Sequence, residues 1–368
     1  MQIFSSFVTK LRYTSKLLMA DIQKYFIEFH VKIKQDRFKE NKTLREKRDR
    51  ILDRLKNNWD KIFEDLDIDP PKYETFNQGS YDLGTGNIPT NGDYDIDVGI
   101  IIKISKDDYP DPVKVKKWIH DALDGHTKSV EIRRPCVTVS YQQDGEQIYH
   151  VDLAVYCESD DKIYLAKGKL NSNEENRVWE EADPFGLSSL IKEHYSDRDD
   201  DKQFRRIIRY LKRWKDVKFD SDGNAAPIGI GITIAAYKWF EPNKTLIDLF
   251  ANTYKYNDLK ALSQFVQKMI DNYSYVWRDG QYVERLEVIL PVVPNCDLFD
   301  KMSNSQMTSF KEKLENLQKA LEDAIEEAAP EEACKLLQKQ FGDEFPVPEK
   351  KDTAQKRNKA IVSSSASA

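Results

Sequence analysis

Apolar side chains recur along this chain with two periods, one typical of helices and one typical of strands. Residues 21–67 are rich in Leu, Ile, Lys and Glu and contain no Pro or Gly, which predicts one long helix or two consecutive helices. Pro70 and Pro71 then interrupt the pattern. Between about residues 76 and 169 the apolar positions alternate around a turn signal at Asp144 and Gly145. We therefore expect an α+β region there, built on a mixed or mostly antiparallel sheet.

The pattern is helical from Asn176 onward. In residues 200–219 apolar side chains recur at i, i+3, i+4 and i+7, which predicts a helix with one apolar face. Residues 226–240 are apolar and contain glycine, which predicts a buried helix or a close approach between elements. Residues 303–329 predict a surface helix. The polar, low-complexity tail from about Pro346 is typical of a disordered segment.

The composition indicates a globular protein with a charged surface. Hydrophobic residues make up 40% and charged residues 33% of the 368 residues, a length that suits two packed lobes. The net charge of −6 argues against bulk binding to nucleic acid or to a membrane surface, so any phosphate site must be local. No segment approaches the ~20 consecutive apolar residues of a membrane span.

Cysteine usage and the N-terminus favour a cytoplasmic protein. The four cysteines lack CxxC pairs and zinc-like spacing, so we expect reduced, mostly buried thiols; they are Cys136, Cys157, Cys296 and Cys334. The basic N-terminus lacks an unbroken apolar stretch and a clear cleavage site, which argues against a signal peptide. Because Met19 begins "MADIQKYF", we hypothesise that it is the natural start and that the residues before it are an extension.

Three carboxylates carry the candidate chemistry. Asp95 and Asp97 are two residues apart on a predicted strand, so their side chains share one face. Asp152 stands among alternating apolar residues on a second predicted strand, where a charge needs a partner. Neighbouring carboxylates repel unless a cation lies between them, and oxygen ligands suit Mg²⁺, for which Mn²⁺ can substitute. Carboxylates on adjacent strands can hold two such ions for phosphoryl transfer.

A small turn stands just upstream of the first two carboxylates. Gly79 allows close approach of backbone to a phosphate, and Ser80 adds a hydroxyl and an amide N–H. Gly84 and Thr85 extend this flexible cradle. The segment is neither a Walker loop, since no GK[ST] follows, nor a Rossmann fingerprint. An acidic pair alone often faces solvent or caps a turn, but the ordered set of turn, acidic pair and third carboxylate predicts a nucleotide site.

This ordered set resembles the polymerase-β-like nucleotidyltransferases. It is most similar to the bacterial CD-NTases, relatives of cyclic GMP-AMP synthase, and among them to the DncV-like group. The matching segments are "NQGSYDLGT", "DYDIDVGI", "YHVDLAVY", "NRVWEEADP", "IIRYLKRWKD" and "PIGIGITIAA". The resemblance implies a sheet lobe packed on a helical lobe with long N-terminal helices. The implied division is N-terminal helices at 1–70, catalytic core at 71–170, helical lobe at 171–342 and tail at 343–368.

The resemblance also implies roles for individual residues. Asp95, Asp97 and Asp152 would hold two Mg²⁺ ions, while Gln78, Gly79, Ser80 and Lys212 would bind the nucleotide triphosphate. Lys212 lies at the edge of the apolar helix face, where it could reach into a cleft or be a solvated surface lysine. Asp183 either reads a base edge or caps a helix before Pro184. The family often has a serine that this chain lacks, for which Thr233 or glycine backbone could substitute.

Four arginines on the same predicted helix indicate a solvated basic face; they are Arg205, Arg206, Arg209 and Arg213.

The resemblance implies condensation of ATP and GTP into a cyclic di- or oligonucleotide, by default 3′,3′-cyclic GMP-AMP, for an effector in antiphage (CBASS) signalling. The alternatives are transfer to RNA or to a protein acceptor, and a catalytically inactive binding module. The tail ending at Ala368 is compatible with conjugation by a ubiquitin-transfer-like partner and equally with a segment of no function.

Overall fold

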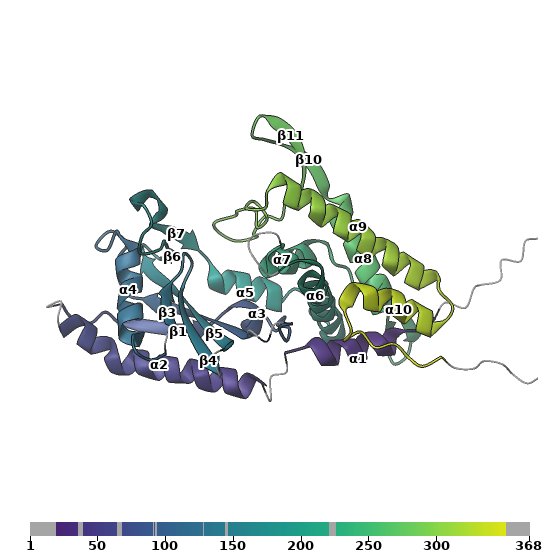
Figure 1. The fold of residues 1–368 in the computed structure, drawn as a ribbon, viewed down its shortest axis with the longest axis horizontal. Helices are drawn as coiled ribbons and strands as arrows, with labels where there is room; N and C mark the ends of the chain where they lie inside the picture. Colours follow the sequence, from purple (N-terminus) through teal and green to yellow (C-terminus); the bar gives the residue numbers. More distant parts are fainter. Residues whose placement is uncertain are drawn as a thin grey trace, which may run out of the picture.

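The computed structural model describes residues 20–35, 40–64, 68–90, 92, 94–127, 129–143, 146–220 and 226–350. The turn at residues 144–145, the start at Met19 and the part of the predicted tail beyond residue 350 lie outside the described residues. The predicted start of the tail at residue 343 is wrong, because Phe345 is buried in the core of the helical lobe and Glu344 pairs with Arg213. The described chain forms a sheet lobe and a helical lobe that lie side by side (Figure 1). This confirms the predicted α+β class. No helix among the described residues is both long enough and apolar enough to span a bilayer.

The helices are α1 (Gln23–Ile33), α2 (Glu40–Glu64), α3 (Gly79–Asp82), α4 (Pro112–Leu123), α5 (Pro184–Lys192), α6 (Arg198–Lys218), α7 (Gly229–Trp239), α8 (Asp258–Asp271), α9 (Asn304–Glu326) and α10 (Pro330–Phe341). The strands are β1 (Tyr73–Asn77), β2 (Tyr94–Ile102), β3 (Ser129–Ile132), β4 (Val137–Gln143), β5 (Glu146–Ser159), β6 (Lys162–Lys167), β7 (Val178–Ala182), β8 (Lys244–Asp248), β9 (Thr253–Tyr256), β10 (Tyr273–Arg278) and β11 (Gln281–Leu286).

The central sheet is mixed, as the alternation predicts. Its strands run in the order β1-β2-β5-β4-β3, with β6 added to β5 and β7 added to β6. Strands β2 and β5 pair in parallel, and the other pairs in the sheet are antiparallel. Helices α2 and α4 pack together beside the sheet and share its main core. The parallel pair at the centre of the sheet carries the acidic residues.

The N-terminal segment forms two helices that pack on different lobes. Phe26 and Phe29 of α1 pack on Tyr210 of α6 in the core of the helical lobe. Helix α2 instead buries Leu55 and Trp59 in the core of the sheet lobe. The periodicity of residues 21–67 correctly predicts helix but does not show that its two halves join different cores.

The expectation of uninterrupted helix after Asn176 is wrong in three places. Strand β7 extends the sheet past residue 170, and β8–β9 forms a two-stranded hairpin. A second hairpin, β10–β11, projects from the helical lobe (Figure 1). Partners on other segments decide these elements. In β7, Glu180 and Glu181 pair with lysines of β6 across the strands, which the pattern of one short segment cannot reveal.

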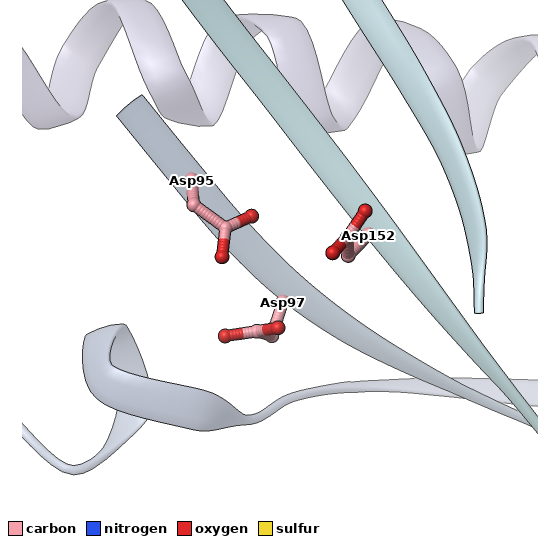
Figure 2. A group of neighbouring side chains, drawn as sticks. All are labelled: Asp95, Asp97 and Asp152. Atoms are coloured by element: carbon pink, nitrogen blue, oxygen red, sulfur yellow. The ribbon is translucent and has the colours of Figure 1, made fainter. Parts of the chain in front are cut away.

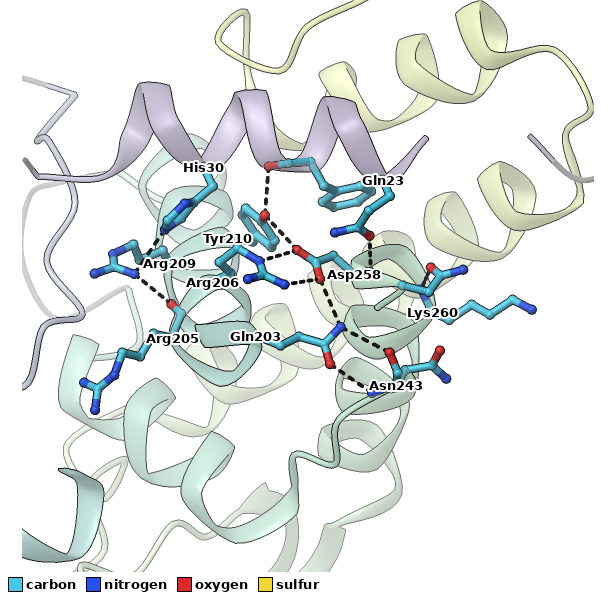
Figure 3. A network of polar contacts seen from close by, with 12 residues as sticks. Gln23, His30, Gln203, Arg205, Arg206, Arg209, Tyr210, Asn243, Asp258 and Lys260 are labelled. Atoms are coloured by element: carbon cyan, nitrogen blue, oxygen red, sulfur yellow. Dashed lines mark hydrogen bonds and ion pairs between the residues drawn. The ribbon is translucent and has the colours of Figure 1, made fainter. Parts of the chain in front are cut away.

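The expectation of a solvated arginine face on α6 is also wrong. Helix α6 packs against α1, α7, α8 and α10, and Arg213 is 0% exposed. Arg205, Arg209 and Arg213 donate to backbone carbonyls of the loop that follows α3. Arg206 forms an ion pair with Asp258 of α8 (Figure 3). Long cationic side chains here find acceptors on distant segments, so α6 can be buried on nearly every side.

We expect Asp258→Asn to destabilise the helical lobe strongly. Asp258 accepts two hydrogen bonds from Arg206, at 2.6 and 2.8 Å, and others from Tyr210 and Gln203 (Figure 3). Burial raises the pKa of Asp258, but the Arg206 hydrogen bonds lower it below its ordinary value. Asparagine would leave Arg206 without a balancing charge, at a cost of about 3–5 kcal/mol in the free energy of unfolding, measured by denaturant titration.

The matched control is Asp21→Asn, which weakens an ion pair to Lys255 at the surface. Exposed pairs contribute less than about 1 kcal/mol, so this variant should unfold close to the unmodified chain. Equal destabilisation by the two variants would contradict a special role for the buried network.

Candidate active site

A cleft of about 570 Å³ lies between the two lobes. The sheet supplies Asp95, Asp97 and Tyr156 to its lining, and α6 supplies Lys212. The other lining segments are the α3 turn, the start of α5, the first turns of α7 and the loop from Leu290 to Cys296. Both polar and apolar side chains therefore surround a space of the size that binds small molecules.

The three aspartates meet on one face of the parallel strand pair (Figure 2). Asp97 of β2 is the register partner of Asp152 of β5, and Asp95 precedes Asp97 by two residues. Each offers a carboxylate oxygen, and these oxygens lie within 4.8 Å of one another. The predicted sharing of a face is therefore present. The closeness of Asp97 to Asp152 follows directly from the parallel register of β2 and β5, which could not be predicted from the sequence alone.

The electrostatics of this group fit a divalent cation. Burial, and then the nearby charge of Asp152, raise the pKa of Asp97 to about 6, although Lys212 opposes the shift. Thr138 of β4 donates from its hydroxyl to Asp152 at 2.5 Å and so orients that carboxylate. Three converging, mutually repelling carboxylates are the oxygen donor set that hard cations such as Mg²⁺ prefer. The residues present therefore fit the predicted metal.

Gly79 is required by the position of Asp97. Its φ angle is +67°, in the region that favours glycine. A Cβ atom at Gly79 would lie only 1.8 Å from Oδ2 of Asp97. The backbone of Gln78 also donates to the carbonyl of Asp97 at 3.2 Å. The turn and the acidic strand are thus packed against each other, which sequence reasoning did not foresee when it assigned Gly79 to phosphate approach alone.

Lys212 points into the cleft from α6. Its Nζ lies 3.3 Å from Oγ1 and 3.5 Å from the carbonyl oxygen of Thr85. Within the described residues no carboxylate forms an ion pair with it. Burial, and then the charges of Lys215 and Arg209, lower the pKa of Lys212 to about 7. The interpretation of Lys212 as a solvated surface lysine is therefore wrong. Neutral oxygens of Thr85 hold its ammonium group in the cleft, where an anionic ligand would stabilise the positive charge.

The sheet lobe matches a known family. Residues 73–156 match the family of cyclic GMP-AMP synthase DncV-like proteins, in its nucleotidyltransferase domain. This match supports a relationship between the chain and the DncV-like nucleotidyltransferases. The cyclic GMP-AMP synthase of Escherichia albertii is 28% identical over 155 residues, covering 40% of this chain and 32% of that protein. The c-di-GMP synthase of Roseivirga ehrenbergii is 23% identical over 227 residues, covering 54% and 58%. The chain thus matches less than two thirds of either relative.

Solved structures show that the likeness of fold extends over most of the chain. CdnC of E. coli MS115-1, solved with ATP, has a TM-score of 0.61 at 19% identity, covering 88% of this chain and 98% of that one. The Bradyrhizobium diazoefficiens CD-NTase CdnG, solved with GTP, has a TM-score of 0.64 at 14% identity, covering 89% and 96%. The chain therefore has the polymerase-β-like fold of these CD-NTases.

Asp183 and Thr233 both line the cleft, and each is already engaged locally. Asp183 caps α5 by accepting from the backbone N–H of Gly186 at 2.7 Å, so the capping interpretation is confirmed. Its base-reading role stays a prediction. The buried Thr233 hydroxyl donates to the carbonyl of Gly229 at 3.1 Å. A phosphate contact by Thr233 would have to use the remaining lone pairs of that oxygen.

Sequence reasoning missed several residues that line the cleft. Tyr156 lies four residues after Asp152 on the same strand face, and its hydroxyl donates to Oε1 of Gln78 at 3.0 Å. This strand spacing could have revealed it. Asp82 accepts from Ser188 and Lys192 across the cleft, and the loop from Leu290 to Cys296 closes one side. The sequence around Asp82 and around the loop from Leu290 to Cys296 contains no local pattern that predicts these roles, because both depend on contacts with distant segments.

Proposed function

We propose that the chain is a nucleotidyltransferase that condenses nucleoside triphosphates into a cyclic di- or oligonucleotide and releases pyrophosphate. One observation carries the proposal: the carboxylates of Asp95, Asp97 and Asp152 converge, and Asp95 and Asp97 line a cleft whose lining also includes Ser80 and Lys212. One wall suits a bound cation and the other a polyphosphate. The relatives named as cyclic GMP-AMP synthase and c-di-GMP synthase support this chemistry.

Different residues of the cleft would position the metal ions and the phosphate groups. The three aspartates would hold two Mg²⁺ ions, with Mn²⁺ as a substitute, which neutralise phosphate charge and make an attacking hydroxyl more acidic. Thr138 keeps Asp152 in one orientation through its hydrogen bond. Ser80 offers its hydroxyl, and Lys212 its charge, to phosphate oxygens. In this mechanism the residues orient the substrates and neutralise charge, and none of them forms a covalent intermediate.

Two features favour a nucleotide over a macromolecule as the acceptor. The cleft has the volume of a small-molecule site, and apolar side chains such as Leu165, Ile230 and Leu290 line it for nucleobases. The net charge of −6 disfavours extended binding of RNA. Transfer to RNA or to a protein acceptor is the alternative, since the same carboxylates would serve it.

The proposed product is a purine dinucleotide made from ATP and GTP, with 3′,3′-cyclic GMP-AMP as the default. Structural neighbours have been solved with ATP and with GTP, and CdnC also in a complex with a HORMA protein. We propose a role in antiphage (CBASS) signalling, in which an effector binds the product. We further propose that a ubiquitin-transfer-like partner acts at the C-terminus, whose residues lie outside the described part of the chain.

A label-transfer assay separates the two acceptor classes. Each of the four triphosphates, labelled at the α-phosphate, is incubated with the chain, the other three triphosphates and Mg²⁺, with or without RNA. Phosphatase treatment then precedes chromatography. The proposal expects a small, phosphatase-resistant labelled product without RNA. Label found only on RNA or on protein would contradict cyclic nucleotide synthesis and would support transfer to that acceptor instead.

The Lys212→Met variant should weaken use of nucleotide substrates. Methionine keeps the packed stem but removes the charge, so one charge-assisted hydrogen bond to phosphate is lost. Such bonds contribute about 1.5–3 kcal/mol, which corresponds to a roughly 10- to 100-fold lower kcat/KM. Lys215→Met is the control, because Lys215 pairs with Asp216 on the same helix. Equal losses in both variants would contradict a direct phosphate contact.

A further inference from the structure

A second pocket adjoins the catalytic cleft and shares Asp82 with it. This basic pocket, of about 720 Å³, lies between α1, the end of α5, the first half of α6 and the loop after α3. Asp82 lines both spaces, Leu83 lines the cleft and Gly84 lines the basic pocket. The loop is therefore the wall between them. Seven cationic side chains of the described residues line the basic pocket: Lys34, Lys192, Arg198, Lys202, Arg205, Arg206 and Arg209.

Within the described residues, the pocket's cations outnumber the carboxylates that form ion pairs with them. Those carboxylates are Asp82, Asp199, Asp201 and Asp258. Lys34 and Arg198 form no side-chain ion pair or hydrogen bond within the described part of the chain. His30 in the pocket accepts from Arg209 at 3.2 Å, and burial together with the charges of Arg209, Arg206 and Lys34 lowers its pKa to about 3. Among the described residues, the pocket therefore has more cationic side chains than paired carboxylates. Figure 3 shows the contact between His30 and Arg209 in this pocket.

The same cations hold the wall of the catalytic cleft. Arg205 donates to the carbonyl of Leu83, and Arg209 donates to the carbonyls of Gly84 and Gly86. Lys192 binds the carboxylate of Asp82 at 2.8 Å. Hydrogen bonds from cations to phosphate oxygens are stronger than those to neutral carbonyls. A phosphate in the pocket would therefore compete for the groups that hold the loop.

We propose that the basic pocket binds a compact anion with two or more phosphate groups, and that its occupancy shifts the 82–86 loop and the adjoining turn at Gly79 and Ser80. The ligand is compact because Glu193 and Asp197 on the segment joining α5 to α6, and Asp199 in the first turn of α6, are exposed and would repel an extended polyanion. The volume of the pocket suits a small molecule. The site regulates the cleft rather than contributing to its chemistry, and binding can be tested without turnover.

Calorimetric titration with sodium tripolyphosphate, in buffer with EDTA, tests the binding. The chain should bind one tripolyphosphate, and Lys34→Glu/Arg198→Glu should weaken binding at least tenfold. Lys114→Glu/Lys319→Glu changes net charge equally at exposed sites outside both pockets and should bind as the unmodified chain does. Unchanged affinity in the first variant would place the anion in the catalytic cleft and overturn the proposal. So would equal losses in both variants, or binding of RNA but not tripolyphosphate.

Hydrogen exchange tests the coupling. Amides of residues 78–88 should change their exchange rates when tripolyphosphate binds the unmodified chain, and should not change in Lys34→Glu/Arg198→Glu at the same concentration. Thermal unfolding first establishes that both charge variants are folded. Binding that leaves exchange at residues 78–88 unaltered would overturn the regulatory half of the proposal.

Discussion

Replacing Asp95 and Asp97 together with asparagine will reduce pyrophosphate release at least about 1,000-fold, because the site loses its capacity to bind cations. The variant keeps the shape of both side chains and removes both charges. Burial and Asp152 already raise the pKa of Asp97, so removing charge relieves repulsion. The double variant should therefore melt at the same temperature as the unmodified chain or higher, while its activity is lost.

Asp160→Asn/Asp161→Asn provides the matched control. These two aspartates occupy a turn with φ angles of 52° and 58°, a conformation that asparagine also tolerates, between β5 and β6. The control removes the same charge outside the residues that line the cleft and should retain full activity. Residual activity above one tenth of normal in Asp95→Asn/Asp97→Asn would contradict the assignment of the carboxylates to catalysis.

Gly79→Ala should reduce activity by about 100-fold or more. Its Cβ would overlap the carboxylate of Asp97, so either the turn or the carboxylate must move, and small displacements of catalytic groups cost about that factor. The positive φ angle adds a further cost of about 1–2 kcal/mol in stability. The steady-state rate and the free energy of unfolding are measured on the same preparation.

Gly280→Ala separates the two effects. Gly280 lies in the β10–β11 turn with φ of +84°, and no atom lies within 4 Å of the position its Cβ would take. This variant should lose stability alone and keep its activity. If Gly79→Ala lost only stability, as Gly280→Ala should, the close packing of turn and carboxylate would have no catalytic consequence.

The site could be predicted from the sequence because its members occupy strands and a turn with local signals. The i, i+2 spacing of Asp95 and Asp97 and the apolar neighbours of Asp152 set the side-chain directions before any partner strand is known. Gly79 was singled out from the sequence for phosphate approach, which stays a prediction. Its close packing against Asp97 depends on the pairing of β1 with β2. The resemblance to CD-NTases, rather than helix geometry, decided the choice of Lys212.

The rest of the fold depends on contacts between distant segments. The arginines of α6 have the spacing of an exposed face, yet the loop after α3 and Asp258 supply their acceptors from far along the chain. Strand β7 and the hairpins β8–β9 and β10–β11 are short, and their partners rather than their own periodicity define them. A single sequence contains no direct record of such pairing.

Mass spectrometry of the reaction product tests the central claim most directly. The unmodified chain is incubated with all four nucleoside triphosphates and Mg²⁺ or Mn²⁺, then with phosphatase. We expect a phosphatase-resistant species with the mass of a cyclic di- or oligonucleotide, absent when Asp95 and Asp97 are replaced. Linear oligonucleotides alone, or the same cyclic species from the variant, would contradict it.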